Sequence, residues 1–211
     1  MSWKEPLVSI FRKTPSDAEI IFHKLRLHAR VPWLLAAALL LTQPAAVQAQ
    51  FTFVTNNGAI TITGYAGTGG AVVIPSATNG WPVTSIGSYA FSNCTSVTSV
   101  TIPDSVTNIG DYAFELCSSL TNAMIGANVI NIGQFAFFQC AGLASVTIPD
   151  SVTGIGTGAL GFCTGLTNVT IGTNVTSIGS VAFEMCSLLT SVTIPNSLPT
   201  SEAIRSGIPP A

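Results

Sequence analysis

The even spacing of its five cysteines constrains the fold of this chain more than any other feature. Each cysteine follows the previous one by 23 residues. A repeat of about 20 to 50 residues is typical of a solenoid, because one unit cannot bury its apolar side alone and stacks on its neighbours. We therefore predict about five stacked coils within residues 83–198. The cysteines are Cys94, Cys117, Cys140, Cys163 and Cys186.

Other residues recur with the same period. Each unit carries an Ile-Gly-x-x-Ala-Phe-x-x-Cys segment, except that coil four has Leu160 in the Phe column, with Phe162 as a candidate replacement. The Ala-to-Cys spacing predicts one short helical turn per coil. The next segment alternates apolar and polar residues, as in 97–102, and predicts one β-strand per coil. A second apolar column comprises Val83, Val106, Val129, Val152, Val175 and Leu198.

The residue after each predicted strand alternates between proline and glycine. Proline ends a strand by removing a backbone donor, and glycine permits a sharp bend. This alternation indicates a two-coil unit within the array. The residues are Pro103, Gly126, Pro149, Gly172 and Pro195.

The recurring phrase Ser-Val-Thr-Ile-Pro-Asp-Ser-Val-Thr-x-Ile-Gly-x-x-Ala-Phe-x-x-Cys resembles the BspA-like subclass of leucine-rich repeats, over residues 71–198. Together with the columns, the resemblance predicts a right-handed, β-rich leucine-rich-repeat superhelix with one strand and one short helical turn per coil. It also implies secretion or display at the cell surface. Some members of this family adhere to host matrix proteins, so the resemblance implies a role in adhesion.

Residues 1–49 are predicted to be a signal peptide. Six basic and three acidic residues give this segment a net charge of +3, and an apolar run from Trp33 to Leu41 follows. The sequence Ala46-Val-Gln-Ala49 then offers small residues before Gln50, as at a cleavage site. The apolar run is about half of the roughly 20 residues that span a bilayer. An uncleaved anchor and a short buried helix remain the alternatives.

Residues 50–82 are predicted to form an N-terminal cap and a leading coil. Two strand-like runs within 51–63 flank Asn57-Gly58, a strong hairpin signal. Such a hairpin would shield the open edge of the first coil. Val83 follows Ile74 by nine residues, whereas Val106 follows Ile102 by four, so this leading coil carries a five-residue insertion. Residues 199–211 lack the period and are predicted to be an unstructured tail or a truncation.

Charge excludes several functions for the part beyond Ala49, which carries one cation, Arg205, against six acids and has no lysine or histidine. Nucleic acids and anionic membranes require clustered basic residues, so neither is an expected partner, and we expect no membrane insertion. Catalysis generally needs His, Lys or a carboxylate pair in a pocket. Asp104 and Asp150 share a column, but the Pro and Ser beside each indicate turn capping. We predict no enzyme, no catalytic residue and no cofactor.

The five cysteines are predicted to be structural. All occupy one inward column, so disulfides between stacked neighbours would leave one cysteine over. A buried free thiol acts as a small apolar filler, which is the interpretation we favour. One cysteine per coil without histidine does not match a zinc arrangement, so we predict no metal site.

The outward strand residues are the candidate binding residues, for an extracellular protein or glycan. Phe138, near Phe135, Tyr112 and Tyr89, is a second candidate because other coils have Ser, Glu or Gly in its column, and we expect it to be exposed. The alternatives are a structural spacer whose polar ladder only solvates the sheet, and ice binding by that ladder. The outward residues are Ser99, Asn122, Ser145, Asn168 and Ser191, with Thr101, Met124, Thr147, Thr170 and Thr193.

The C-terminal end of the array predicts one further property. Nothing periodic follows Leu198 to cover the apolar residues of coil five. An uncovered coil exposes both its core and its strand edges. We therefore expect self-association through this end.

Overall fold

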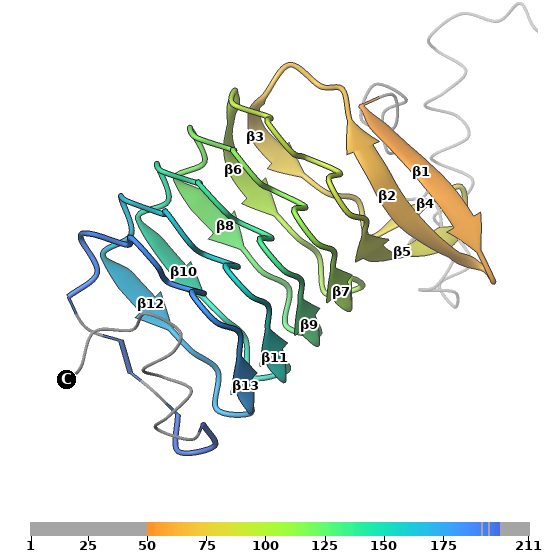
Figure 1. Ribbon diagram of the computed structural model, residues 1–211. Helices are drawn as coiled ribbons and strands as arrows, with labels where there is room; N and C mark the ends of the chain where they lie inside the picture. The colour runs from red at the N-terminus through yellow and green to blue at the C-terminus, as the bar shows by residue number, and fades with distance from the viewer. Residues whose placement is uncertain (1–49, 191, 194, 199–211) are drawn as a thin grey trace, which may run out of the picture. The chain divides into compact units, whose positions relative to one another are not determined.

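The computed structural model describes residues 50–190, 192–193 and 195–198, which form a solenoid of stacked coils (Figure 1). Two β-sheets run along the stack, and the chain passes from one to the other in every coil. Sheet A has the order β1-β2-β5-β7-β9-β11-β13, with β4 paired to β5. Sheet B has the order β12-β10-β8-β6-β3.

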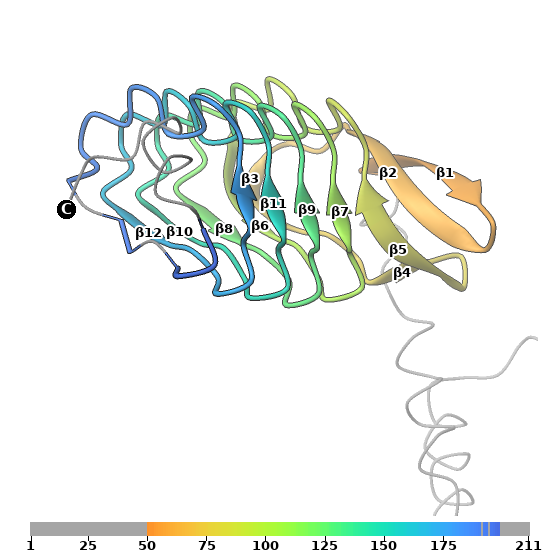
Figure 2. The same cartoon turned by 60° about the horizontal axis from the view of Figure 1, so that its bottom comes forward.

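The strands of sheet A are β1 (Phe51–Asn56), β2 (Ala59–Tyr65), β4 (Ala77–Thr78), β5 (Trp81–Ile86), β7 (Asn108–Ile109), β9 (Asn131–Ile132), β11 (Gly154–Ile155) and β13 (Ser177–Ile178). Those of sheet B are β3 (Gly70–Val73), β6 (Val97–Thr101), β8 (Asn122–Met124), β10 (Ser145–Thr147) and β12 (Asn168–Thr170). From a second side, β7, β9 and β11 follow one another in a row along the stack (Figure 2).

The strand register reproduces the 23-residue period. Ser145 pairs with Asn168 in sheet B, and Asn108 pairs with Asn131 in sheet A, both in parallel. Equivalent residues of successive coils therefore stand directly beside one another. This confirms the predicted β-solenoid of about five coils.

Coils one to four each contribute two strands, and coil five contributes β13 and the bridge from Thr170 to Thr193, whereas the sequence predicted one strand per coil. In coils two to five the strand in sheet A is only two residues long, as in β7. Its ladder continues beyond the strand, because the Gly110 amide donates to the Ile86 carbonyl of the preceding coil at 2.8 Å. A strand of two residues is too short for an alternating pattern to reveal it.

The predicted helical turn is not confirmed, because the described residues contain no helix. The segment that follows each short strand of sheet A is a series of turns, which we call the turn segments: 88–93, 111–116, 134–139, 157–162 and 180–185. In each turn segment, the residues at the second and sixth positions have a left-handed backbone conformation. Such residues interrupt a right-handed helix. The residues are Tyr89, Asn93, Tyr112, Leu116, Phe135, Gln139, Gly158, Phe162, Val181 and Met185.

The backbone amides of a turn segment alternate between two directions. In coil two, the amides of Tyr112, Phe114 and Leu116 donate to carbonyls of coil three at 2.8, 2.7 and 2.8 Å. The amides of Glu115 and Cys117 donate within the coil, at 3.2 and 3.3 Å. A helix would direct all its amides along its own axis. Stacking therefore uses the donors that a helix would need.

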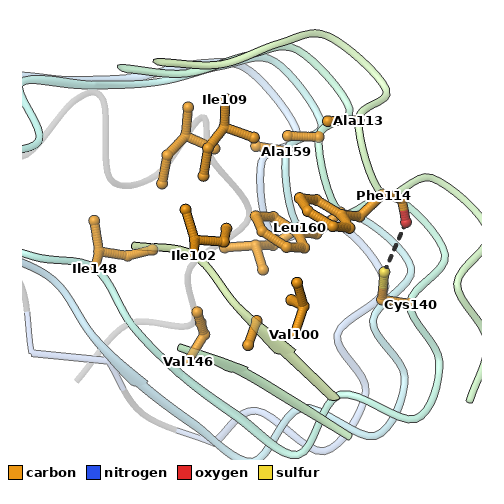
Figure 3. Packing of buried hydrophobic residues seen from close by; sticks show 14 of the residues in the cluster. Val100, Ile102, Ile109, Ala113, Phe114, Cys140, Val146, Ile148, Ala159 and Leu160 are labelled. Atoms are coloured by element: carbon orange, nitrogen blue, oxygen red, sulfur yellow. Dashed lines mark hydrogen bonds between the residues drawn. The ribbon is translucent and has the colours of Figure 1, made fainter. Parts of the chain in front are cut away.

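The core consists of stacked columns enclosed by the two sheets and the turn segments (Figure 3). The rings of Phe91, Phe114 and Phe137 stack at centroid distances of 4.8 and 5.0 Å. Leu160 continues this column and is fully buried. Phe162 does not replace the missing ring in the core, because it lies half-buried against Phe138 of the preceding turn segment.

Two hairpins precede coil one. Asn57 and Gly58, with φ of 49° and 77°, join β1 to β2, which pairs in parallel with β5 and so extends sheet A. Asn79 and Gly80, with φ of 52° and 80°, join β4 to β5 in a second hairpin that was not predicted. The turn of this second hairpin lies between residues 74 and 83, in the segment that carries the five additional residues. Its signal was the same Asn-Gly pair that marks the first turn.

The proline–glycine alternation has a packing reason. A Cβ at Gly126 would lie 2.5 Å from the carbonyl oxygen of Pro103, and one at Gly172 would overlap the carbonyl oxygen of Pro149. Coils two and four therefore require glycine where they stack on the proline carbonyls of coils one and three. The packing unit is a pair of coils.

The predicted signal peptide, residues 1–49, and the predicted tail, residues 199–211, lie outside the described residues. Within the described part of the chain, no helix has the length and apolar character to cross a bilayer.

Candidate functional site

The predicted strand residues form two adjacent columns on the outer face of sheet B. Strand pairing places Thr147 beside Thr170, and Ser99 beside Asn122. The two columns thus give a row of polar side chains repeated at the strand spacing of about 4.8 Å. Ser99 and Thr101 are half-buried, and Ser191 lies outside the described residues. The exposed members are Asn122, Met124, Ser145, Thr147, Asn168, Thr170 and Thr193.

The side chains of these two columns differ in their hydrogen bonds from other threonines of the solenoid. The hydroxyls of Thr121 and Thr167 donate to carbonyls of the preceding coil, each at 3.0 Å. In the two candidate columns, Thr101 Oγ1 lies 4.0 Å from Met124 Sδ. Otherwise, the side chains of these columns form no hydrogen bond among the described residues. Their polar groups are therefore available to a ligand.

A depression of about 370 Å³ interrupts this face between coils two and three. Coil two differs here from its neighbours, with Ala123 in the valine column and Met124 in the threonine column. Met124 is 58 % exposed, so the depression has an apolar side within a polar face. Its lining comprises Asn122, Ala123, Met124, Ile125, Ala127, Ser145, Val146, Thr147 and Pro149.

The second candidate, Phe138, is half-buried rather than exposed as predicted. Its ring packs edge-on against Phe135 and Phe162, with centroid distances of 5.3 Å to each. Glycines make room for these rings, because a Cβ at Gly158 would overlap the Phe135 ring and one at Gly161 would lie 3.2 Å from Phe138. The sequence comparison of columns could not show this, because the space is provided by glycines of the next coil.

Phe138 belongs to an outer ladder of rings along the turn segments. Tyr89 stacks on Tyr112 at 4.8 Å with an interplanar angle of 2°, and Tyr112 stacks on Phe135 at 5.0 Å. Tyr89 is 57 % exposed, whereas Tyr112 and Phe135 are half-buried. The ladder therefore presents one largely exposed ring, at the end nearest coil one.

The carboxylates are engaged with backbone groups of the next coil. Asp104 Oδ1 accepts from the Ala127 amide at 2.7 Å. Asp150 Oδ1 accepts from the Thr173 amide at 2.7 Å and from its hydroxyl at 3.1 Å, and these hydrogen bonds lower the pKa of Asp150. Both aspartates thus cap turns. Among the described residues there is also no cluster of three or more His, Cys, Asp or Glu side chains that could hold a metal.

The cysteines form a ladder of thiols and carbonyls. All five are free; four are buried and Cys94 is half-buried. Cys140 Sγ donates to the Phe114 carbonyl at 3.1 Å (Figure 3), and Cys117 Sγ donates to the Phe91 carbonyl at 3.1 Å. Burial raises the pKa of Cys94 and of Cys186 to about 11. Cys94 and Cys186 are therefore neutral at physiological pH, and the thiol hydrogen bonds link successive coils.

Sequence reasoning missed an amide ladder on the outer face of sheet A. Asn131 Nδ2 donates to Asn108 Oδ1 at 3.0 Å, and Asn108 Nδ2 donates to Ser85 Oγ at 3.3 Å. The signal was present, since the three residues share one 23-residue column. The ladder joins three coils and leaves these side chains less available than those of sheet B.

Solved structures similar to this chain are bacterial leucine-rich repeat proteins. A leucine-rich repeat protein of T. pallidum has 36% identity and a TM-score of 0.68, with 70% of each chain covered. A leucine-rich cell surface protein of Faecalibacterium prausnitzii has 40% identity and a TM-score of 0.65, over 71% of this chain and 42% of that one. The pneumococcal vaccine antigen PcpA, at 20% identity and a TM-score of 0.51 over 70% of this chain and 48% of that one, shares the fold. Comparison with curated proteins finds no match.

The family comparison covers more than half of the chain. The BspA type leucine-rich repeat region matches residues 84–203, with 6 copies. The matched range includes every coil that carries the 23-residue cysteine column. This chain belongs to the BspA-type leucine-rich repeat family.

Proposed function

We propose that this chain is a non-enzymatic recognition scaffold, secreted or held at the cell surface, that binds an extracellular protein or glycan through the two outward columns of sheet B. The observation that carries the proposal is the contrast between the threonines that immediately precede the strands of sheet B and those on the strands. Thr121 and Thr167 direct their hydroxyls to carbonyls, whereas Thr147 and Thr170 leave theirs unbonded among the described residues.

The rigidity of the sheet favours binding at this face. Backbone pairing fixes Ser145 beside Asn168 and Thr147 beside Thr170, so little conformational entropy remains to be lost when a ligand is bound. Several weak polar contacts at regular spacing then add up on an extended ligand. The depression beside Met124 offers an apolar contact within the same face.

The F. prausnitzii relative supports the location, since that protein is described as a cell surface protein and is 40% identical over 71% of this chain. The predicted signal peptide, residues 1–49, supports export. Fractionation of producing cells, with an antibody against the chain, tests this. We expect the chain in the medium or the surface fraction, and its retention in the cytoplasm would contradict the proposal.

Binding is tested by incubating the chain with arrays of glycans and of immobilised extracellular matrix proteins. A Thr147→Arg variant places a long charged side chain in the middle of the face and should abolish most of the binding. Ser177→Arg is the matched control, because Ser177 is exposed on sheet A. Equal loss in both variants, or no loss in either, would place the binding elsewhere.

The two alternative functions give different outcomes in the same experiments. A spacer would bind nothing on either array and would tolerate both arginine variants. An ice-binding protein would inhibit ice recrystallisation, and Thr147→Arg would remove that effect. The exposure of Met124, 58 %, in the threonine column disfavours ice binding because it breaks the regular hydroxyl array.

A further inference from the structure

The stacked tyrosines of coils one and two form a second surface, on the turn segments rather than on sheet B. One face of the Tyr89 ring is covered by Tyr112 at 4.8 Å, while 57 % of the residue is exposed. The backbone beneath is fixed, because the Tyr89 amide donates to the Asp111 carbonyl at 3.0 Å. Tyr89 is therefore an exposed aromatic ring that is already ordered before any partner arrives.

Two acidic residues lie in the turn segment of Tyr112. Asp111 precedes Tyr112 in its turn segment, and Glu115 lies three residues after it. Glu115 Oε2 accepts from Ser92 Oγ at 3.2 Å, which draws the carboxylate toward coil one, the coil of Tyr89. The pKa of Tyr112 is raised by desolvation first, and then by the nearby Tyr89, Glu115 and Asp111. The Glu115 carboxylate therefore lies toward coil one, beside the ring pair, whereas the Asp111 carboxylate faces coil three.

Within the described residues, no basic side chain is present to form an ion pair with these carboxylates. That part of the chain contains five acids and no lysine, arginine or histidine. Asp111 Oδ1 accepts from the Gln134 amide at 2.8 Å, and this leaves its negative charge uncompensated. Aromatic rings carry negative potential on their faces, so rings and carboxylates attract the same kind of group.

We propose that Tyr89, Tyr112 and Glu115 form a site for a cationic side chain, an arginine or lysine presented by an extended segment of a partner protein. The cation packs on the exposed side of the Tyr89 ring and is held by the Glu115 carboxylate. Arginine fits better than lysine, because its planar guanidinium stacks on a ring and offers several donors to a carboxylate. This surface is distinct from the sheet B columns and can bind a partner independently of them.

A neutral glycan fits the surface less well. Sugar rings use aromatic faces, but Tyr112 has both faces covered, by Tyr89 and by Phe135. Only one ring face therefore remains for stacking, whereas the Glu115 carboxylate adds an attraction that a neutral sugar cannot use. Charge complementarity accordingly favours the cationic partner.

The experiment follows the ring signals of the chain's three tyrosines by NMR, with tyrosine-selective isotope labelling. The probe is the acetylated and amidated peptide Arg-Gly-Arg, and the matched peptide Glu-Gly-Glu is the negative control. We expect the Arg peptide to shift the signals of Tyr89 and Tyr112. Tyr65 packs on Phe91 in the inner column at 5.2 Å and serves as an internal reference.

Three variants test the roles of ring and charge. Tyr89→Leu and Glu115→Gln should each weaken the affinity for the Arg peptide by about two- to fivefold, the range of an exposed cation–π contact or ion pair. Glu184→Gln removes the same charge from the same column in coil five, where the ladder has Val181, and should change the affinity little. Unchanged thermal unfolding would show that each variant folds.

Two outcomes would overturn the proposal. Equal weakening by Glu115→Gln and Glu184→Gln would mean that the acidic solenoid attracts cations without a site. A neutral oligosaccharide that shifts Tyr89 while the Arg peptide does not would identify the ring as part of a sugar platform.

Discussion

At the scale of single residues, the left-handed positions of the turn segments carry the largest local cost. Asparagine and glycine accept a positive φ readily, as at Asn93 and Gly158, but most members of the two columns are larger. Val181 is the extreme case, because a β-branched residue at φ 55° is rare. In the other coils the amide at this position donates to the next coil, which offsets the strain. Among the described residues, no carbonyl receives the Val181 amide.

Replacing Val181 with glycine should therefore stabilise the chain, by about 1 kcal/mol, since it removes the left-handed strain at a partly exposed position. Thermal or urea unfolding measures this. Val175→Gly is the matched control, because Val175 is fully buried and its loss should destabilise. A lower midpoint for Val181→Gly would show that the side chain contributes more than its backbone strain costs.

The thiols provide a pH-dependent test. Burial raises the pKa of Cys94 and Cys186 from 9.0 to about 11 in the folded chain. Above about pH 9 the folded state binds more protons than the unfolded state, so stability falls as pH rises toward 11 and is unaffected below 9. We expect the unfolding midpoint to be constant from pH 7 to 9 and then to drop. A Cys94→Ala, Cys186→Ala variant should show a shallower drop, and an equal drop would assign the effect to other groups.

At the scale of the elements, each coil is shaped by the coil before it. Pro103 and Pro149 present carbonyls that exclude a side chain at Gly126 and Gly172. Asp104, next to Pro103, accepts the amide of Ala127 in the coil with glycine. Proline, aspartate and glycine therefore act together across an interface between two coils.

Gly126→Ala should consequently cost about 1 to 3 kcal/mol of unfolding free energy, because its Cβ would lie 2.5 Å from the Pro103 carbonyl oxygen. Gly154→Ala is the control, since its Cβ would meet only Ser177 Oγ, at 3.2 Å. Urea unfolding of both variants gives the comparison. Similar costs for the two would mean that the backbone of coil two relaxes away from coil one.

At the scale of the whole solenoid, the two ends differ. The first hairpin extends sheet A at the N-terminal end, through pairing of β2 with β5. At coil five the amides of Val181, Phe183 and Met185 have no carbonyl partner among the described residues. Met185 and Leu188 are 59 % and 54 % exposed there. Amides without a partner in the described part of the chain, beside exposed apolar side chains, favour contact with another surface.

We therefore expect the chain without residues 1–49 to self-associate through coil five. Sedimentation at tens of micromolar tests this, and Leu188→Glu should shift the population to monomer by adding charge to the contact. Met124→Glu, at an equally exposed position on sheet B, should not. A monodisperse monomer, both with residues 199–211 and after their deletion, would contradict the expectation.

The sequence determined the period, the number of coils, the inward columns and the first hairpin, because each depends on local spacing or on a turn dipeptide. The 23-residue interval alone requires parallel stacking in register, and the polar columns of sheet B follow from alternation within one strand. Membership of the family was also readable, from the phrase in residues 99–117.

Only the tertiary structure decided what neighbouring coils do to one another. The helical turn was predicted from spacing within a coil, but the Tyr112, Phe114 and Leu116 amides bond to coil three instead. The exposure of Phe138 depended on the glycines of coil four, and the short strands of sheet A exist only as rungs between coils. In each case the deciding contact joins residues about 23 positions apart, and a pattern within one coil contains no information about it.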